Sequence, residues 1–356
     1  MNYNILFVWL AFAAVISKST RSAFLTTENG YEQLKATKNF AFLTFLPIII
    51  FVCTSTWRYW GDYSGYLANY RSFPTNPTMA LSHIMAQKDS RLFYAFTYLV
   101  KVLSGGSVLA YRLALAVLQS LPFIYLYRKY SPNYVFSVYL FVATANPIGW
   151  MLNGVRQLVA ACIIYAATPL IVEKKFFKVI LVILFASLFH QTAVLMIPIV
   201  FIAQGEAWNW KTNLAIVGAV ILAVIFARFS GATDVMLQAA GYDTKNLVGD
   251  DGTHPLRVLV SFVPVLLAWM YRRQIKQDNS AAINVFVNMS IVSFGIYLIA
   301  MVTSGILVGR VPLYTSLYSF ILLPYLIPRL FSRSTAKLVS WITVFFYFLY
   351  YYVQYM

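Results

Sequence analysis

The sequence has few of the residues on which metal sites, disulfides and nucleotide sites depend. Its 356 residues include two cysteines and three histidines. Cys53 and Cys162 lie inside apolar runs and cannot form a disulfide framework. No histidine has a second metal ligand three or four residues further along, and no phosphate-binding loop, dinucleotide-binding motif or GxSxG motif occurs. We therefore expect neither a metal nor another cofactor.

Charge is also scarce, and most of it is positive. Charged residues make up 11% of the chain, against about 25% in an ordinary soluble domain, and hydrophobic residues make up 60%. These proportions exclude a soluble globular or a disordered protein. Lys and Arg number 27 and Asp and Glu 11, which gives a net charge of +16. Because the basic residues are spaced between apolar runs, they indicate a polytopic membrane protein and no nucleic-acid partner.

Eleven apolar segments are candidates to cross the hydrocarbon core as helices. They are residues 3–17, 39–56, 109–127, 133–147, 155–172, 176–203, 212–229, 256–271, 282–303, 311–328 and 337–355. The positive charges of Lys18 and Arg21 follow the first segment, whereas those of a signal peptide precede it, so this segment is interpreted as a retained helix. The chain is predicted to be all-α, one transmembrane domain over residues 1–356 with about 10–12 membrane segments.

Two longer connections lie between these segments, and both are predicted to be external. Residues 57–108 contain an amphipathic stretch, 91–103, whose apolar residues recur at helical spacing and which we expect to lie along the membrane surface. Residues 230–255 form the second loop, which is rich in Asp.

The positive-inside rule fails for a chain that simply alternates across the membrane. If segment 176–203 crosses once, Arg272 and Arg273 fall outside. This segment has 28 residues with polar His190-Gln191-Thr192 at its centre. Two half-membrane helices that meet near His190 would return the chain to the cytoplasm, and such broken helices occur where they line a cavity. The alternative is a long tilted helix with a further crossing near 231–248.

Under the broken-helix topology, the external basic residues are mostly arginines. They are Arg58, Arg71, Arg91, Arg112, Arg156, Arg228, Arg257 and Arg310, with Lys88, Lys101 and Lys245. Arginine on the outside does not assist insertion. It is the residue that holds pyrophosphate or carboxylate groups by paired hydrogen bonds.

Several polar motifs interrupt the apolar pattern on this external side. Aromatic residues near the second segment fit an interfacial belt, but Arg58 and Asp62, followed by Tyr63 and Tyr66, also suit a sugar ring. Arg156, between Asn153 and Gln157, opens the fifth segment, where an arginine is costly unless it is paired or faces water.

Three further polar positions are weaker signals. His190 lies at the centre of an apolar run, which favours a functional role over a structural one. Arg310 follows Gly309 at the external end of a segment, with Tyr314 beyond it, and is equally consistent with an interfacial arginine. The stretch from Asp251 to Arg257 is interpreted first as a solvated loop.

Together these motifs resemble the Wzy/EpsG-type polysaccharide polymerases. The resemblance rests on the Arg58–Tyr66 cluster, on Asn153-Gly154-Val155-Arg156-Gln157 at a helix start, on Phe189-His190 some 34 residues later, and on Gly309-Arg310. Thr192 stands where this family commonly has Ser shortly after the His. The family implies a GT-C-like, metal-independent glycosyltransferase that joins undecaprenyl-pyrophosphate-linked repeats on the periplasmic or outer side of the bacterial inner membrane.

This glycosyl-transfer chemistry predicts a role for each candidate residue. Arg156 and Arg310 are assigned to the pyrophosphates, with Arg257 and Arg58 as secondary candidates. His190 is the first candidate for the base that activates the acceptor hydroxyl, and Asp62 or Asp251 the second. The remaining candidates would bind the sugars: Tyr63, Tyr66, Tyr314, Asn153 and Gln157.

Two other functions stay open. A flippase or transporter of the same glycans would also need arginines in a cavity, although no internal repeat of the transporter kind is evident. A membrane acyltransferase acting on surface sugars would use an intramembrane His and Arg, with the His facing a cytoplasmic cavity. The expected partners are lipid-linked glycans and membrane lipids, and a co-polymerase that regulates chain length is a candidate.

Overall fold

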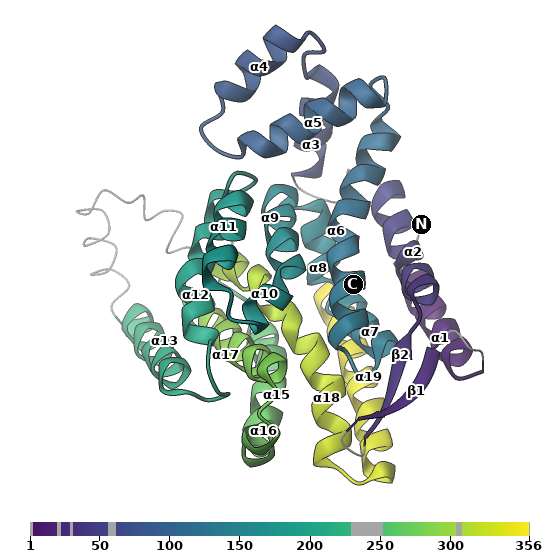
Figure 1. Cartoon of the computed structure of the whole chain (residues 1–356), viewed down its shortest axis with the longest axis vertical. Coiled ribbons are helices and arrows are strands. Elements are labelled where there is room, and N and C mark those ends of the chain that lie inside the picture. Colours follow the sequence, from purple (N-terminus) through teal and green to yellow (C-terminus); the bar gives the residue numbers. More distant parts are fainter. Residues whose placement is uncertain are drawn as a thin grey trace. The chain divides into compact units, whose positions relative to one another are not determined.

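A computed structural model describes residues 3–19, 23–28, 31–55, 62–228, 252–303 and 308–355. Helices dominate these residues (Figure 1). The chain divides into two compact units. The first comprises Met1–Ile171, Lys175–Leu195 and Trp341–Met356, and the second comprises Val172–Lys174 and Met196–Ser340.

The first unit contains a β-hairpin and most of the N-terminal helices. In chain order its elements are α1 (Asn4–Ser19), β1 (Ala23–Glu28), β2 (Tyr31–Ala36), α2 (Lys38–Thr54), α3 (Tyr63–Ser72), α4 (Pro77–Met85), α5 (Arg91–Leu103), α6 (Val108–Tyr130), α7 (Tyr134–Ala143), α8 (Asn146–Leu152), α9 (Val155–Ala166), most of α10 (Thr168–Val172), α11 (Phe176–Ser187), the 3-10 helix η2 (Gln191–Leu195) and the greater part of α19 (Arg333–Tyr355). Helix α6 packs against both α2 and α9.

Helix α6 connects two ends of this unit. At 23 residues it is about 34 Å long. At its start, the Tyr70 hydroxyl donates to the Ser107 carbonyl at 3.2 Å, and α3, α4 and α5 gather there (Figure 1). At its other end, Lys35 of the hairpin donates to the Ser131 carbonyl at 3.4 Å. The hairpin and the α3–α5 group therefore lie at opposite ends of a helix long enough to span a membrane.

Buried Lys101 fixes the α3–α5 group. Its Nζ donates to the carbonyl oxygens of Tyr70, Arg71 and Phe73 at 2.9, 2.7 and 2.7 Å. These carbonyls lie at the end of α3, where a helix leaves acceptors unpaired and where a cation is favourable. The Tyr70 ring also stacks on Tyr111 of α6, with centroids 4.1 Å apart. The result is a rigid support for the start of α5.

The second unit is built around α17. Its elements are α12 (Met196–Ala203), α13 (Trp210–Arg228), α15 (Pro255–Met270), α16 (Arg272–Asp278), α17 (Ala281–Met301), the 3-10 helices η4 (Val308–Tyr314) and η5 (Ser316–Tyr318), α18 (Ser319–Leu330) and the start of α19. Helix α17 packs against α12, α13, α15, α18 and both 3-10 helices. In the most apolar 18-residue stretch of α17, 72% is buried, against 11% in that of α13. Helix α17 is therefore the core helix of this unit, and α13 is peripheral.

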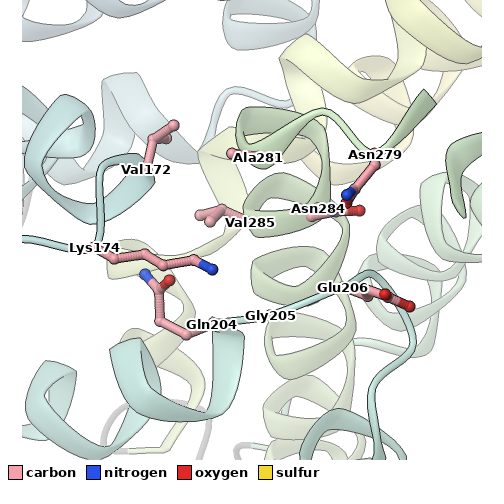
Figure 2. A pocket seen from close by; sticks show the side chains of 9 residues that line it. All are labelled: Val172, Lys174, Gln204, Gly205, Glu206, Asn279, Ala281, Asn284 and Val285. Atoms are coloured by element: carbon pink, nitrogen blue, oxygen red, sulfur yellow. Dashed lines mark hydrogen bonds between the residues drawn. The ribbon is translucent and has the colours of Figure 1, made fainter.

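A cavity of about 330 Å³ lies at the start of α17. Figure 2 shows Lys174 and Gln204 on one side of it and Asn279 and Asn284 on the other. Lys174 precedes α11 and Gln204 follows α12, so segment 176–203 begins and ends at the same end of α17. A single crossing would separate these two residues by about 30 Å. The alternative with one tilted helix through 176–203 is therefore excluded. The predicted break is confirmed, because helix α11 ends at Ser187 and the next helix begins at Gln191.

The all-α polytopic prediction is confirmed, and each predicted apolar segment coincides with a helix or a helix pair. Within the described residues, four helices are long and apolar enough to span a membrane, or seven when each bent pair counts as one span, and five shorter apolar helices accompany them. The number of crossings and the single-domain interpretation stay predictions. The β1–β2 hairpin is an addition that the sequence did not predict.

Candidate functional site

Arg156 lies in the first turn of α9, at a sharp junction with α8. Gly154 has φ of 95°, a left-handed conformation that favours glycine, and it directs the chain from α8 into α9. Asn153 ends α8, and its Oδ1 accepts a hydrogen bond from the Asp62 amide at 3.5 Å. The junction therefore also holds the start of α3.

The Arg156 guanidinium is held from one edge. Its Nη1 donates to Asp89 Oδ1 at 3.2 Å and to Ser90 Oγ at 3.3 Å. Ser90 has φ of 58°, an unfavourable conformation for a non-glycine residue, and such outliers cluster at functional sites. The guanidinium carbon also lies 6.0 Å from the centre of the Tyr66 ring. Arg156 Nε is buried and has no hydrogen-bond partner among the described residues.

The predicted sugar-binding tyrosines differ in exposure. Tyr66 is half-buried and packs edge-on against Phe93, with centroids 5.7 Å apart. Tyr63 is 1% exposed and lies under the Arg112 guanidinium at 5.7 Å, and burial raises the pKa of its phenol. Tyr314 in the second unit is also buried. In this conformation only Tyr66 of the three can reach a ligand beside Arg156.

His190 lies in the turn between α11 and η2. Its Nδ1 is 2.8 Å from Thr192 Oγ1, and the Thr192 amide donates to the same nitrogen at 3.4 Å. The Gln157 amide nitrogen donates to Thr192 Oγ1 at 3.3 Å. Because Gln157 follows Arg156 directly, this hydrogen bond joins the arginine helix to the histidine turn. The structure thus brings together the two most specific predicted motifs.

The start of α5 docks on the same turn. The Leu92 amide donates to the Leu188 carbonyl at 3.1 Å, which satisfies a free amide at a helix start. This contact places Asp89 and Ser90, immediately before α5, within reach of Arg156. The sequence reasoning did not assign Asp89, Ser90 or Thr192 to the site.

The second unit holds a separate arginine pair at the end of α17. Arg257 lies in the first turn of α15 and Arg310 in η4. The Thr253 amide donates to the Ala300 carbonyl at 2.8 Å, and a Cβ on Gly309 would lie 2.7 Å from Thr253 Oγ1. The segments that carry the two arginines are therefore packed together. Of the other candidates, Arg58 and Asp251 lie outside the described residues.

An anion could bind to Arg156, whose helix is joined to the polar turn at His190. Sequence comparison identifies the family. The sequence model of the EpsG family matches residues 39–356, nearly the whole chain. The chain belongs to the EpsG family. No curated protein and no solved structure gives a significant match. Membership indicates a membrane polysaccharide polymerase in general, with glycosyltransferase-like activity.

Proposed function

We propose that this EpsG-family protein joins oligosaccharide repeats carried on undecaprenyl pyrophosphate, on the external face of the bacterial inner membrane. The observation that carries the proposal is the Arg156 guanidinium, held by Asp89 on one edge with a buried, unpartnered Nε on the other. A planar guanidinium suits two oxygens of a pyrophosphate, because it can donate paired hydrogen bonds. Tyr66 beside it supplies an aromatic face for the adjoining sugar.

The distribution of charge supports an external site. In the first unit Lys35 lies near the end of α6 that carries Arg128 and Lys129, whereas Asp89 and Arg156 associate with the α3–α5 group at its start. Basic clusters mark the cytoplasmic side of membrane proteins. The arginine site would then face the periplasm or the exterior.

The second unit has the same arrangement. Lys174 lines the cavity at the start of α17, and Lys276 pairs with Glu206 of the same cavity at 3.5 Å. Arg257 and Arg310 lie near the other end of α17, whose 21 residues extend about 31 Å. If the lysine end is cytoplasmic, these arginines face the exterior.

The proposed reaction is a substitution at the anomeric carbon of the growing chain. The acceptor hydroxyl oxygen forms the new bond, the bond from the anomeric carbon to the phosphate oxygen breaks, and undecaprenyl pyrophosphate leaves with the electron pair. His190 would take the hydroxyl proton, and the Asp62 carboxylate, exposed at the start of α3, is the second candidate. Arg156 would stabilise the charge that develops on the leaving group, and Arg310 is also proposed to contact a pyrophosphate.

We propose that this charge is stabilised without a metal. Within the part of the chain that the structure describes, no three His, Cys, Asp or Glu side chains group closely enough to hold a metal ion. Guanidinium groups can supply the positive charge instead, as fixed donors that need no ligand set. Grooves between the helices would hold the prenyl tails, and a chain-length co-polymerase would act on the same external side.

The test is polymerisation by the purified protein with lipid-linked repeats alone. We expect a ladder of longer glycans and release of undecaprenyl pyrophosphate. Arg156→Ala should abolish the ladder in folded protein, and Arg156→Lys should restore it only in part because it lacks the paired donors. Arg91→Ala, an exposed arginine at the start of α5, is the matched control and should retain activity.

Three results would contradict the proposal. Lipid movement across sealed vesicles without a ladder would favour the flippase, and full activity of Arg156→Ala would remove this residue from the site. Transfer of an acyl group to the glycan would favour the acyltransferase.

A further inference from the structure

The cavity at the start of α17 has no part in the proposed polymerase site. It is lined by residues from three segments of the second unit, 172–174, 204–206 and 279–285. Arg257 and Arg310 lie near the other end of α17, which is about 31 Å long. The cavity volume of about 330 Å³ is within the range of pockets that hold small molecules. The cavity is therefore a candidate for a separate binding site.

Two buried asparagines of α17 hold one wall of this cavity in place. Asn288 is 0% exposed, and its Nδ2 donates to the carbonyl oxygens of Ala203 and Glu206 at 3.0 and 3.1 Å. Asn284 Oδ1 accepts a hydrogen bond from the Ala207 amide at 3.1 Å. These bonds fix the backbone that follows α12 to α17, so the wall is formed before any ligand binds.

The backbone around the cavity is strained at Lys174. Lys174 has φ of 57° and Asn279 has φ of 41°, both in the left-handed region. Asparagine tolerates this conformation, whereas lysine adopts it at a cost. Residues held in such conformations cluster at ligand-binding sites. A costly conformation at the residue that carries the charge of the cavity favours a role in binding.

Lys174 supplies the positive charge that faces the cavity. Figure 2 shows its side chain extending across the cavity, whereas the Glu206 carboxylate is directed away from Lys174. Glu206 Oε2 lies 3.5 Å from Lys276 Nζ, which balances its charge. The Asn284 side-chain amide donates to Asn279 Oδ1 at 3.0 Å, which engages this oxygen and leaves the Asn279 N–H groups as donors. A positive charge and amide donors together suit an anion.

We propose that Lys174 and Asn279 bind a phosphate group in this cavity, either in a lipid head group or as free phosphate. A lysine ammonium binds phosphate as a point charge. Basic pockets between membrane helices on the cytoplasmic side bind the head groups of anionic lipids, and this end of α17 is the one proposed to be cytoplasmic. A bound phosphate would bridge the chain before α11 and the start of α17, and so stabilise the second unit. Binding here does not depend on which reaction the protein catalyses.

Thermal unfolding of the purified full-length protein in detergent tests the site. Sodium phosphate and short-chain phosphatidylglycerol are titrated separately at constant ionic strength, with phosphatidylcholine as the lipid without net charge. We expect a rise in the unfolding temperature, because a ligand that binds only the folded protein stabilises it. A rise with phosphatidylglycerol alone identifies a lipid head group, a rise with phosphate alone identifies a soluble ligand, and a rise with both shows that the phosphate group itself is recognised. No rise with either probe, or an equal rise with phosphatidylcholine, would overturn the proposal.

Variants of the lining separate binding from folding. Lys174→Gly removes the ammonium and suits the left-handed backbone, so we expect it to fold and to bind the effective probe about tenfold more weakly. Asn279→Asp retains an acceptor for Asn284, and its negative charge should weaken binding at least as much. Lys178→Gln, an exposed lysine of α11 outside the lining, is the matched control and should retain the affinity. An unchanged affinity in Lys174→Gly would overturn the proposal.

Discussion

Asp89 offers a direct test of how Arg156 is prepared for an anion. Its carboxylate contacts only the Nη1 edge of the guanidinium, at 3.2 Å, and Arg156 Nε remains buried without a partner among the described residues. Asp89 should therefore orient Arg156 and leave its second edge free for pyrophosphate. Asp89→Asn retains a carbonyl acceptor of the same shape and removes only the charge.

The size of the effect follows from the exposure of the pair. A hydrogen bond to a charged group contributes about 1.5–3 kcal/mol when buried, and an exposed ion pair about 0.2–1 kcal/mol. The Arg156 and Asp89 side chains are 27% and 34% exposed, so solvent screens part of their interaction. We expect a loss of about 1 kcal/mol, which corresponds to about a fivefold fall in kcat/KM.

The assay is initial-rate polymerisation with lipid-linked repeats, read for both kcat and KM. Lys88→Gln is the matched control, since it removes an exposed charge next to Asp89, and we expect no change. In the Arg156→Ala background Asp89→Asn should have no further effect, because residues that act as a unit are not additive. An increase in kcat/KM for Asp89→Asn would refute the reasoning, since it would mean that Asp89 competes with the substrate for Arg156.

Two further predictions concern packing and topology. Gly309→Ala should lower the stability of the protein by about 1–3 kcal/mol, because the added Cβ would lie 2.7 Å from Thr253 Oγ1. The double variant Gly309→Ala/Thr253→Ala should recover the unfolding temperature of the unmodified protein. An unchanged unfolding temperature in Gly309→Ala alone would count against the close approach of Gly309 to Thr253. Lys174→Cys and Glu206→Cys should label from the same side of sealed vesicles, because both residues line one cavity and the native cysteines are buried. Labelling from opposite sides would contradict a segment 176–203 that enters and leaves on one face.

Much of the helical framework could be predicted because a membrane leaves the chain few choices. Backbone groups in hydrocarbon must bond internally, so apolar runs become helices and their ends appear in the hydropathy pattern. The break near His190 was visible as polar residues in an apolar run of excessive length. The bend of 66° between α7 and α8 within segment 133–147 was not predicted. Asn146-Pro147 was a signal for it, since proline favours a helix start and the preceding residues adopt other conformations.

The site was predictable only where its residues share a local pattern. Arg156 and His190 were predicted as separate motifs, and the hydrogen bond from Gln157 to Thr192 now joins them. Asp89 was not predicted, because it is 67 residues from Arg156 in the sequence and no periodicity relates them. Their contact depends on how the start of α5 docks on the turn after α11, which is a property of tertiary packing.

The external basic residues show why charge alone does not define a ligand site. Lys101 and Arg112 belong to the same predicted external group as Arg156. Lys101 gives its ammonium to three carbonyls at the end of α3. Arg112 donates to the Ser55 carbonyl and covers the ring of Tyr63. Both cations therefore serve the scaffold, whereas Arg156 pairs with the carboxylate of Asp89 at 3.2 Å. A buried Nε without a partner among the described residues occurs in both Arg112 and Arg156, so the contact with a carboxylate, and not the unpaired donor, distinguishes Arg156 from these two cations.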